Sequence, residues 1–266
     1  MSLRKKYQEW FVGPLGGPDF NESVHHQVDY GAIELGLLFP RSHIAPNKKT
    51  KPKQCNLYDL IESTDDEVSA DSNTAHKIVS TVASAWSYFR PKINRMALNP
   101  YVVMTAIWDI QVIKQPELTT LFDPLTLQSY LEQDYDSYLN DEGGANWRIR
   151  KHYDEFYSER SEPFEYYKDE IASFLPGKLL YPPNDYQVQK INDINWLRFT
   201  YRPMLNRLER IFYIVQVSPH HMLRVSFSFG RFSTAPDEKW LPKALEDIDK
   251  IMTGTSIKWK ALEGKS

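Results

Sequence analysis

Two adjacent histidine pairs are the residues of this 266-residue chain best suited to metal or acid–base chemistry. His25-His26 and His220-His221 would supply four imidazoles if the fold brought the pairs together. Neighbouring residues of a strand point to opposite faces, so one histidine of each pair is expected to point away from any shared site. No Cys/His or HExxH spacing accompanies them, and His220-His221 directly follow Pro219, as polar turn residues commonly do. We therefore predict no metal site, no cofactor and no catalytic residue.

Clustered carboxylates could instead hold a hard cation such as calcium. Asp134-Tyr135-Asp136 and Asp141-Glu142-Gly143 contain suitable residue types, but the twelve-residue spacing of a calcium loop is absent. The glycine-rich segment 13–18 is neither preceded by a predicted strand nor followed by a helix start, so it does not fit a phosphate loop. We interpret the carboxylates as solvated surface.

Cysteine use and the N-terminus bear on the cellular compartment. Cys55 is the only cysteine, so the chain has no internal disulfide, and we interpret this residue as a loop thiol. The basic N-terminus lacks the apolar run of a signal peptide, and no stretch reaches the roughly 18 apolar residues of a membrane helix. We expect a soluble, cytoplasmic protein, unless a leader has been removed.

The overall charge argues against nucleic acid as the partner. The net charge is −3, whereas phosphate contacts need a clustered basic face. The one basic cluster lies at 47–53 and is punctuated by prolines, as is typical of a solvated loop.

The middle of the chain is an acidic block. Residues 121–180 contain 13 acidic and six basic side chains, a net charge of −7, with tyrosines interleaved among the acids. Tyrosine supplies rigid apolar area with a polar tip, and carboxylates beside it steer a basic partner. We predict that this surface binds another protein, a basic one, although the same rings could pack on their own domain. The candidate partner-binding residues are Asp134, Tyr135, Asp136, Tyr138, Asp141, Glu142, Tyr153 and Tyr157.

A non-enzymatic protein-interaction module is therefore the leading hypothesis, an inhibitor or immunity-type protein being one example. The competing hypothesis is an enzyme or small-ligand-binding protein with a pocket against the C-terminal sheet. The polar groups of that pocket would be Tyr186, Arg198, His220, His221 and Arg224.

The elements that must position these residues start with strands in the N-terminal part, 1–120. Apolar residues alternate over 33–39, which predicts a strand. Residues 101–113 are rich in β-branched and aromatic types, which indicates a long strand buried on both faces. Residues 75–89 favour a helix, because apolar residues recur every three or four positions; a strand is the alternative, because several are β-branched.

The acidic block begins with a predicted helix over 123–139, which Gly143-Gly144 ends. Leu125 is among its predicted buried positions. Residues 146–174 are predicted to be either helical surface or an irregular arm.

The C-terminal part, 181–266, has the sharpest pattern. In the strand predicted over 222–229, apolar residues alternate with polar ones. This pattern predicts that one face of the strand packs on a core and the other face is exposed to water. The predicted elements are a hairpin of strands 186–191 and 196–201, a hairpin of strands 210–217 and 222–229, an amphipathic helix over 242–253 and a short strand over 256–259.

This layout of two hairpins, a covering helix and a short strand resembles the C-terminal half of the PsbP/Mog1-like α/β/α sandwiches. The resemblance is one of layout, so it implies a fold and no function. The sequence thus predicts an α+β protein with a mostly antiparallel sheet and additional N-terminal strands and helices. Parts 1–120, 121–180 and 181–266 could form one domain or several.

Overall fold

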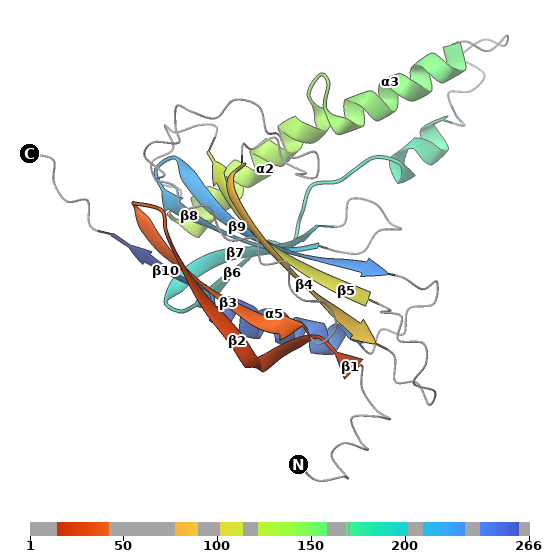
Figure 1. The fold of residues 1–266 in the computed structure, drawn as a ribbon. Helices are drawn as coiled ribbons and strands as arrows, with labels where there is room; N and C mark the ends of the chain where they lie inside the picture. Colours follow the sequence, from red (N-terminus) through yellow and green to blue (C-terminus); the bar gives the residue numbers. More distant parts are fainter. Residues whose placement is uncertain are drawn as a thin grey trace, which may run out of the picture.

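A computed structural model describes residues 15–42, 78–89, 102–113, 122–158, 169, 171–201, 210–231 and 240–260 (Figure 1). Cys55 and the basic cluster at 47–53 lie outside the described residues. Within them the protein is α+β and its sheets are antiparallel, as the sequence predicts.

Seven described strands form the large sheet, and every neighbouring pair is antiparallel. The predicted C-terminal hairpins make one side of it, and a long central strand joins them to the N-terminal part. In spatial order the strands are β1 (Leu15–Gly16), β4 (Ile78–Phe89), β5 (Val102–Val112), β9 (His221–Arg231), β8 (Arg210–Ser218), β7 (Ile194–Tyr201) and β6 (Gln187–Ile191).

A smaller sheet lies on one side of the large one. Its strands, in order, are β10 (Ser256–Trp259), β3 (Ile33–Ser42) and β2 (Pro18–Asp29). The predicted strand over 256–259 is therefore present, and its partner is β3. Helix α5 (Trp240–Thr253) lies beside this sheet (Figure 1). Pro242 falls in its first turn, where a backbone N–H has no helical partner, so the helix begins at Trp240, two residues before its predicted start.

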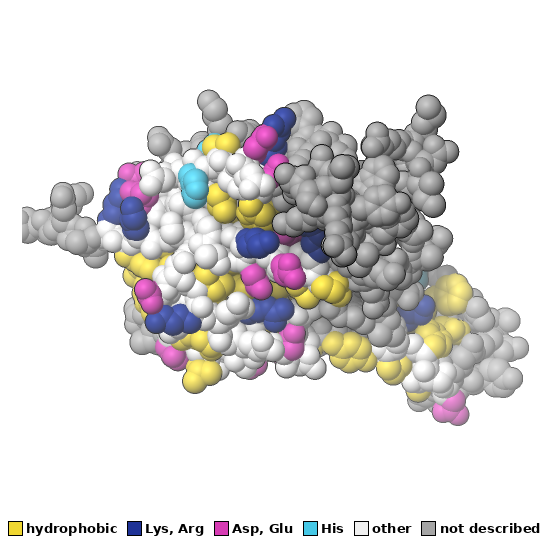
Figure 2. Space-filling model, turned by 90° about the horizontal axis from the view of Figure 1, so that it is seen from below, with side chains coloured by type: hydrophobic (Ala, Val, Ile, Leu, Met, Phe, Trp, Pro, Cys, Tyr) yellow, Lys and Arg dark blue, Asp and Glu magenta, His cyan; other side chains and the backbone are white. Residues whose placement is uncertain are grey.

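Opposite charges are intermingled on this side of the molecule. Figure 2, seen from below the view of Figure 1, shows basic and acidic side chains scattered among each other. Among the described residues, the small sheet, the residue after β10 and α5 contain four ion pairs, between Lys258 and Glu34, Lys260 and Asp29, Lys243 and Asp247, and Arg41 and Glu22.

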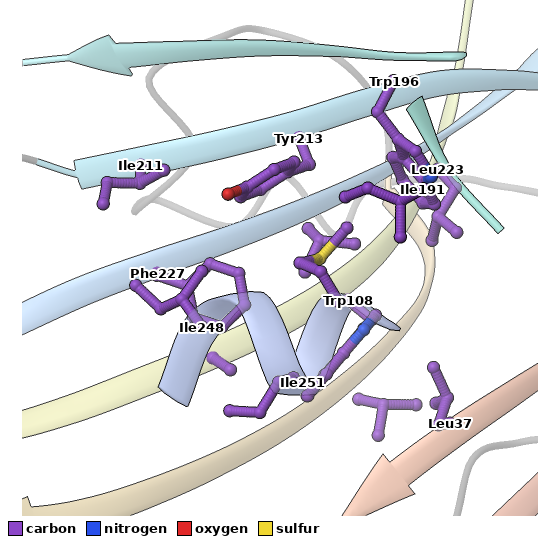
Figure 3. Close-up of a cluster of buried hydrophobic side chains, with 14 of the residues drawn as sticks. Leu37, Trp108, Ile191, Trp196, Ile211, Tyr213, Leu223, Phe227, Ile248 and Ile251 are labelled. Carbon is purple, nitrogen blue, oxygen red and sulfur yellow. The ribbon is translucent and has the colours of Figure 1, made fainter. Parts of the chain in front are cut away.

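The main core fills the space between the large sheet, the small sheet and α5. We call the sheet surface that faces it the inner face. Trp108, Leu223 and Phe227 of the large sheet point toward Leu37 of β3 and Ile251 of α5 (Figure 3). Burial of large apolar side chains from all three layers is the main stabilising contribution here.

The helix predicted over 75–89 is wrong, because Ile78–Phe89 form strand β4. Val82 and Trp86 are buried together, and their spacing of four residues fits one face of a helix as well as one face of a strand. Pairing with β5 along nearly the whole length decides between the two, and the β-branched residues suit it.

The first hairpin turns more tightly than its sequence predicts. Asn192 and Asp193, with φ of 49° and 62°, form the turn, and strand β7 already begins at Ile194. Two consecutive positive φ angles are the geometry of a type I′ turn. The side-chain amide of Asn192 also donates to the carbonyls of Thr253 and Thr255, at 2.7 and 3.0 Å, which ties the hairpin to the end of α5.

Helix α2 (Pro124–Asn140) packs on the opposite side of the large sheet, its outer face, and helix α3 (Ala145–Ser158) follows it in the chain. Helix α2 is capped by Asp123, whose carboxylate accepts from the backbone N–H of Thr126 at 3.0 Å. Helix α3 extends outward beyond the sheet (Figure 1), so the first part of segment 146–174 is helical. Among the described residues no helix is both long and apolar enough to cross a membrane.

Helix α2 makes one prediction about the second hairpin partly wrong. On β9, Leu223, Val225 and Phe227 face the core as expected. Arg224 and Ser226, on the face predicted to be wet, are buried as well. The reason is the second apolar cluster between α2 and the outer face, made of Ile113, Leu127, Tyr130, Leu131, Tyr135, Leu197, Phe199, Tyr201, Phe212, Ile214 and Met222.

Candidate functional site

Helix α2 and the residues directly after it expose four carboxylates to solvent. The buried side chains of the helix recur every three or four residues, so the residues between them form an exposed face. Residues 122–144 contain six acidic side chains and no basic one. Asp134 is buried, and Asp123 caps the helix. The other four are exposed and form what we call the acidic stripe: Glu132, Asp136, Asp141 and Glu142.

Neutral donors hold three carboxylates of the acidic stripe. Gln128 donates to Glu132 at 2.7 Å, Asn140 donates to Asp136 at 2.7 Å, and the hydroxyl of Ser137 donates to Asp141. Since each donor is uncharged, these bonds orient the carboxylates and leave their negative charge in place. The stripe therefore presents oriented anionic groups to solvent.

The N-terminal end of α2 is apolar and exposed. The side chain of Leu125 is 66% exposed and that of Phe122 is 50% exposed. Leu125 was predicted to be buried, and this is wrong: it lies on the exposed face, seven residues before Glu132. The exposed surface of α2 thus combines an apolar end with the acidic stripe.

The negative charge also acts beneath the helix. The pKa of Tyr186 is raised, first by burial and then by Glu132, Asp185 and Asp134. Burial likewise raises the pKa of Tyr135, against a lowering effect of Arg224, and that of Tyr201 to about 12. These tyrosines stay neutral at physiological pH, and within the described residues the hydroxyls of Tyr186 and Tyr201 have no hydrogen-bond partner.

An aromatic row runs across the outer face below α2. The rings of Tyr186 and Phe199 lie 4.9 Å apart, and those of Phe199 and Phe212 are stacked at 5.1 Å. Tyr135 of α2 meets Phe199 edge to face at 6.1 Å. Beyond Phe212, the guanidinium of Arg224 lies 5.9 Å from the ring centroid. The row links the sheet edge to a buried cation.

Arg224 is neutralised by its neighbours on β5. It lies opposite Asp109, with 2.6 Å between Nη2 and Oδ2, and Thr81 of β4 donates to the same carboxylate. With the amide of Gln111 oriented so that its oxygen faces Arg224, that oxygen accepts from Nε, Nη1 and Nη2 at 3.0, 3.1 and 2.9 Å. The guanidinium is therefore committed to the protein itself and is a poor site for an added anion.

The other polar residues of the predicted pocket are distributed over different surfaces. Arg198 lies beside its cross-strand neighbour Tyr213 on the inner face, opposite to Tyr186 and Arg224. His220 is half-buried at the tip of the second hairpin, and His221 is fully buried. Burial, and then the charge of His220, lowers the pKa of His221 to about 4.

The two histidine pairs belong to different sheets. His25 is exposed on β2, whereas the ring of His26 meets Phe39 edge to face at 5.2 Å. His221 shares a hydrogen bond of 2.8 Å between its Nδ1 and the hydroxyl of Ser218. In the described ranges, no group of three or more His, Cys, Asp or Glu side chains could hold a metal ion.

The predicted partner-binding residues divide by type. Asp136, Asp141 and Glu142 are exposed, whereas Asp134, Tyr135 and Tyr157 are buried and Tyr138 and Tyr153 are partly buried. Tyr157 and Tyr153 pack in a small cluster with residues of 171–175. Glu132 and Phe122 are exposed but were not among the predicted partner-binding residues. The period of 3.6 residues could have identified Glu132, four residues before Asp136 and seven after Leu125.

Comparison with known proteins found no relative. No family model, no curated protein and no solved structure matches the chain.

Proposed function

We propose that this chain is a non-catalytic protein-binding module, and that the acidic stripe of α2 contacts a basic partner. The observation that carries the proposal is charge segregation: 122–144 has six acids and no base, and four of the acids are exposed. The side of the molecule in Figure 2 has basic and acidic side chains intermingled instead. A surface of one sign steers a partner of the opposite sign.

Rigidity of the helix supports the same proposal. Leu127, Leu131 and Tyr135 anchor the underside of α2 to the outer face of the sheet, so the carboxylates keep their positions before a partner arrives. A preorganised surface loses less conformational entropy on binding than a flexible one. Leu125 and Phe122 supply apolar area at one end, which a purely electrostatic contact would lack. An inhibitor or immunity-type protein would have this kind of surface.

Charge-neutralising variants test this function. The test variant combines Glu132→Gln, Asp136→Asn, Asp141→Asn and Glu142→Gln, which keeps side-chain shape and the hydrogen-bond acceptors. The matched control changes the same number and types of exposed acids on α3 and α5: Asp154→Asn, Glu155→Gln, Glu246→Gln and Asp249→Asn. Both variants raise the net charge equally, and the control also removes the exposed ion pair between Glu155 and Lys151.

The measurement is capture from native lysate at low and high salt, with mass spectrometry of the proteins retained by wild type and both variants. We expect a basic protein that wild type and the control variant retain at low salt, that high salt releases, and that the test variant loses. A set of retained proteins that is the same for both variants would contradict the proposal.

A small-ligand binder is the second candidate. It is favoured by the hydroxyls of Tyr186 and Tyr201 beneath α2, which have no hydrogen-bond partner among the described residues. Buried polar atoms without a protein partner are often satisfied by a bound molecule or water. Native mass spectrometry of the purified protein tests this candidate. A retained small molecule that Tyr186→Phe and Tyr201→Phe release would support it, and its absence from wild type would count against it.

For the fold, we propose that this protein resembles the PsbP/Mog1-like sandwiches in the order of its layers, with helices on both sides of an antiparallel sheet. Helix α2 on the outer face and α5 on the inner side of an antiparallel sheet support this view. The small sheet beside α5 is an additional layer, and the likeness still implies no activity.

A further inference from the structure

Strand β2 forms the outer edge of the small sheet, and its regular part has few of the features that normally prevent edge-to-edge pairing. Exposed edges attract further strands unless they are short or contain charges such as lysine. Among the described strands, β1 has two residues, β6 has five and includes Lys190, and β10 has four and includes Lys258. Strand β2, the outer edge of the small sheet, has twelve residues and neither lysine nor arginine. In the large sheet, β4 pairs with β1 only through Tyr88 and Phe89 among the described residues.

The regular part of β2 is uncharged up to its last residue. A register shift interrupts the pairing of β2 with β3 between Asp19 and Ser23. After this shift, Ser23–Asp29 pair without interruption with β3, from Ser23 opposite Pro40 to Asp29 opposite Glu34. Asp29 is the only charged side chain in that seven-residue segment. Within the described residues this segment has β3 on one side and no strand on the other.

An apolar surface continues to this edge and is left uncovered there. Val28, His26 and Val24 lie opposite Leu35, Leu37 and Phe39 of β3, so they share the face of the small sheet that lies on the core. Val28 is fully buried, but the exposure of Val24 rises to 41%. Apolar area at an unpaired edge is what an added strand would cover.

We propose that a second copy of this chain adds to this edge, with the two β2 strands antiparallel and His26 on the two-fold axis. This register overlaps the whole regular segment of both copies. It places Val24 of one copy opposite Val28 of the other, His25 opposite Gln27, and Ser23 opposite Asp29. The two small sheets then form one continuous six-stranded sheet.

The side-chain pattern selects this register. A slip of one residue would turn the apolar face of one copy toward the polar face of the other. Slips by two residues shorten the overlap and leave Val24 or Val28 without an apolar neighbour. The two-fold pairing joins equal surfaces, as isologous dimers do, and puts no two acidic residues opposite each other.

Matched lysine substitutions test the interface. Val24→Lys places a charge at the β2 edge, and Val188→Lys makes the same change at the β6 edge, where Val188 is 50% exposed. Sedimentation and light scattering over a dilution series measure the mass, and circular dichroism verifies folding. We expect wild type and Val188→Lys to dimerise and Val24→Lys to remain a monomer. A monomeric wild type, or a dimeric Val24→Lys, would overturn the proposal.

Cysteine crosslinking tests the register separately. Cys55→Ser removes the native thiol, and His26→Cys or Gln27→Cys then introduces a single new one. Across the two-fold axis only residue 26 meets its own copy at the Cβ distance of a facing strand pair, which a disulfide can bridge. With diamide as oxidant, we expect His26→Cys to form covalent dimers and Gln27→Cys to form few. Equal crosslinking of both, or none of either, would overturn this register.

Discussion

Asp109 and Arg224 lie directly opposite each other on β5 and β9, 115 residues apart in sequence, with their charged atoms at 2.6 Å and almost no exposure to solvent. Thr81 and Gln111 complete the hydrogen bonding of the pair. The pair lies on the face of the sheet that α2 covers, so it must be satisfied within the protein.

Breaking this pair should destabilise the fold strongly. Arg224→Met or Asp109→Asn leaves the other charge buried and uncompensated, at a cost of ~3–5 kcal/mol each in free energy of unfolding. The double variant should lose less than the two single losses combined, with a coupling of ~1–3 kcal/mol. Urea unfolding of the four proteins measures this cycle, and strictly additive losses would show that the two residues act independently.

His221 should make stability depend on pH. In the folded protein its pKa is about 4, against 6.5 for an ordinary histidine, so the unfolded chain takes up the proton first as pH falls. The contribution of neutral His221 to the free energy of unfolding is complete above pH 6.5. As pH falls from 6.5 to about 4, the free energy of unfolding should decrease by ~2–3 kcal/mol. Unfolding free energies of wild type and His221→Gln across this range check it. Parallel curves for the two proteins would exclude His221 as the source.

Asn192 should contribute to stability in two ways, through its left-handed backbone conformation and through its side-chain hydrogen bonds. Asn192→Gly keeps the left-handed backbone but loses the bonds to Thr253 and Thr255, at a cost of ~1–2 kcal/mol. Asn192→Ala should cost about 1 kcal/mol more, because alanine tolerates a positive φ poorly. Asp193→Gly is the control in the same turn and should be neutral or stabilising. Thermal unfolding ranks the three variants, and equal effects of Asn192→Gly and Asp193→Gly would argue against the anchor to α5.

Two buried tyrosines should respond oppositely to loss of the hydroxyl. Tyr88 donates to the buried carboxylate of Asp247 at 3.0 Å, so Tyr88→Phe should cost ~1–3 kcal/mol. The hydroxyl of Tyr201 has no partner within the described residues, so Tyr201→Phe should leave stability unchanged or raise it by ~1 kcal/mol. Chemical denaturation of both variants gives the comparison. A large loss in Tyr201→Phe would reveal a partner of that hydroxyl.

Local patterns were enough to predict several elements. Strand β3, the C-terminal hairpins and α5 follow from alternation, turn residues and an amphipathic stripe, all of which depend on neighbours in sequence. Asp123-Pro124 marked the start of α2 for the same reason. In residues 78–89, spacing by four fitted helix and strand alike, so local information could not decide.

Contacts between distant segments decided the rest. The sequence determined that 122–144 is acidic and that 123–139 forms a helix, but packing on the sheet selected which side chains of α2 face outward, burying Asp134 and Tyr135 and exposing Leu125. It determined that Arg224 lies on a strand, but its burial and its pairing with Asp109 required α2 above it and β5 beside it. Likewise, only the order of strands makes β2 an edge. Burial and edge position depend on which distant segments pack against a residue. The periodicity and composition of one segment do not specify those contacts.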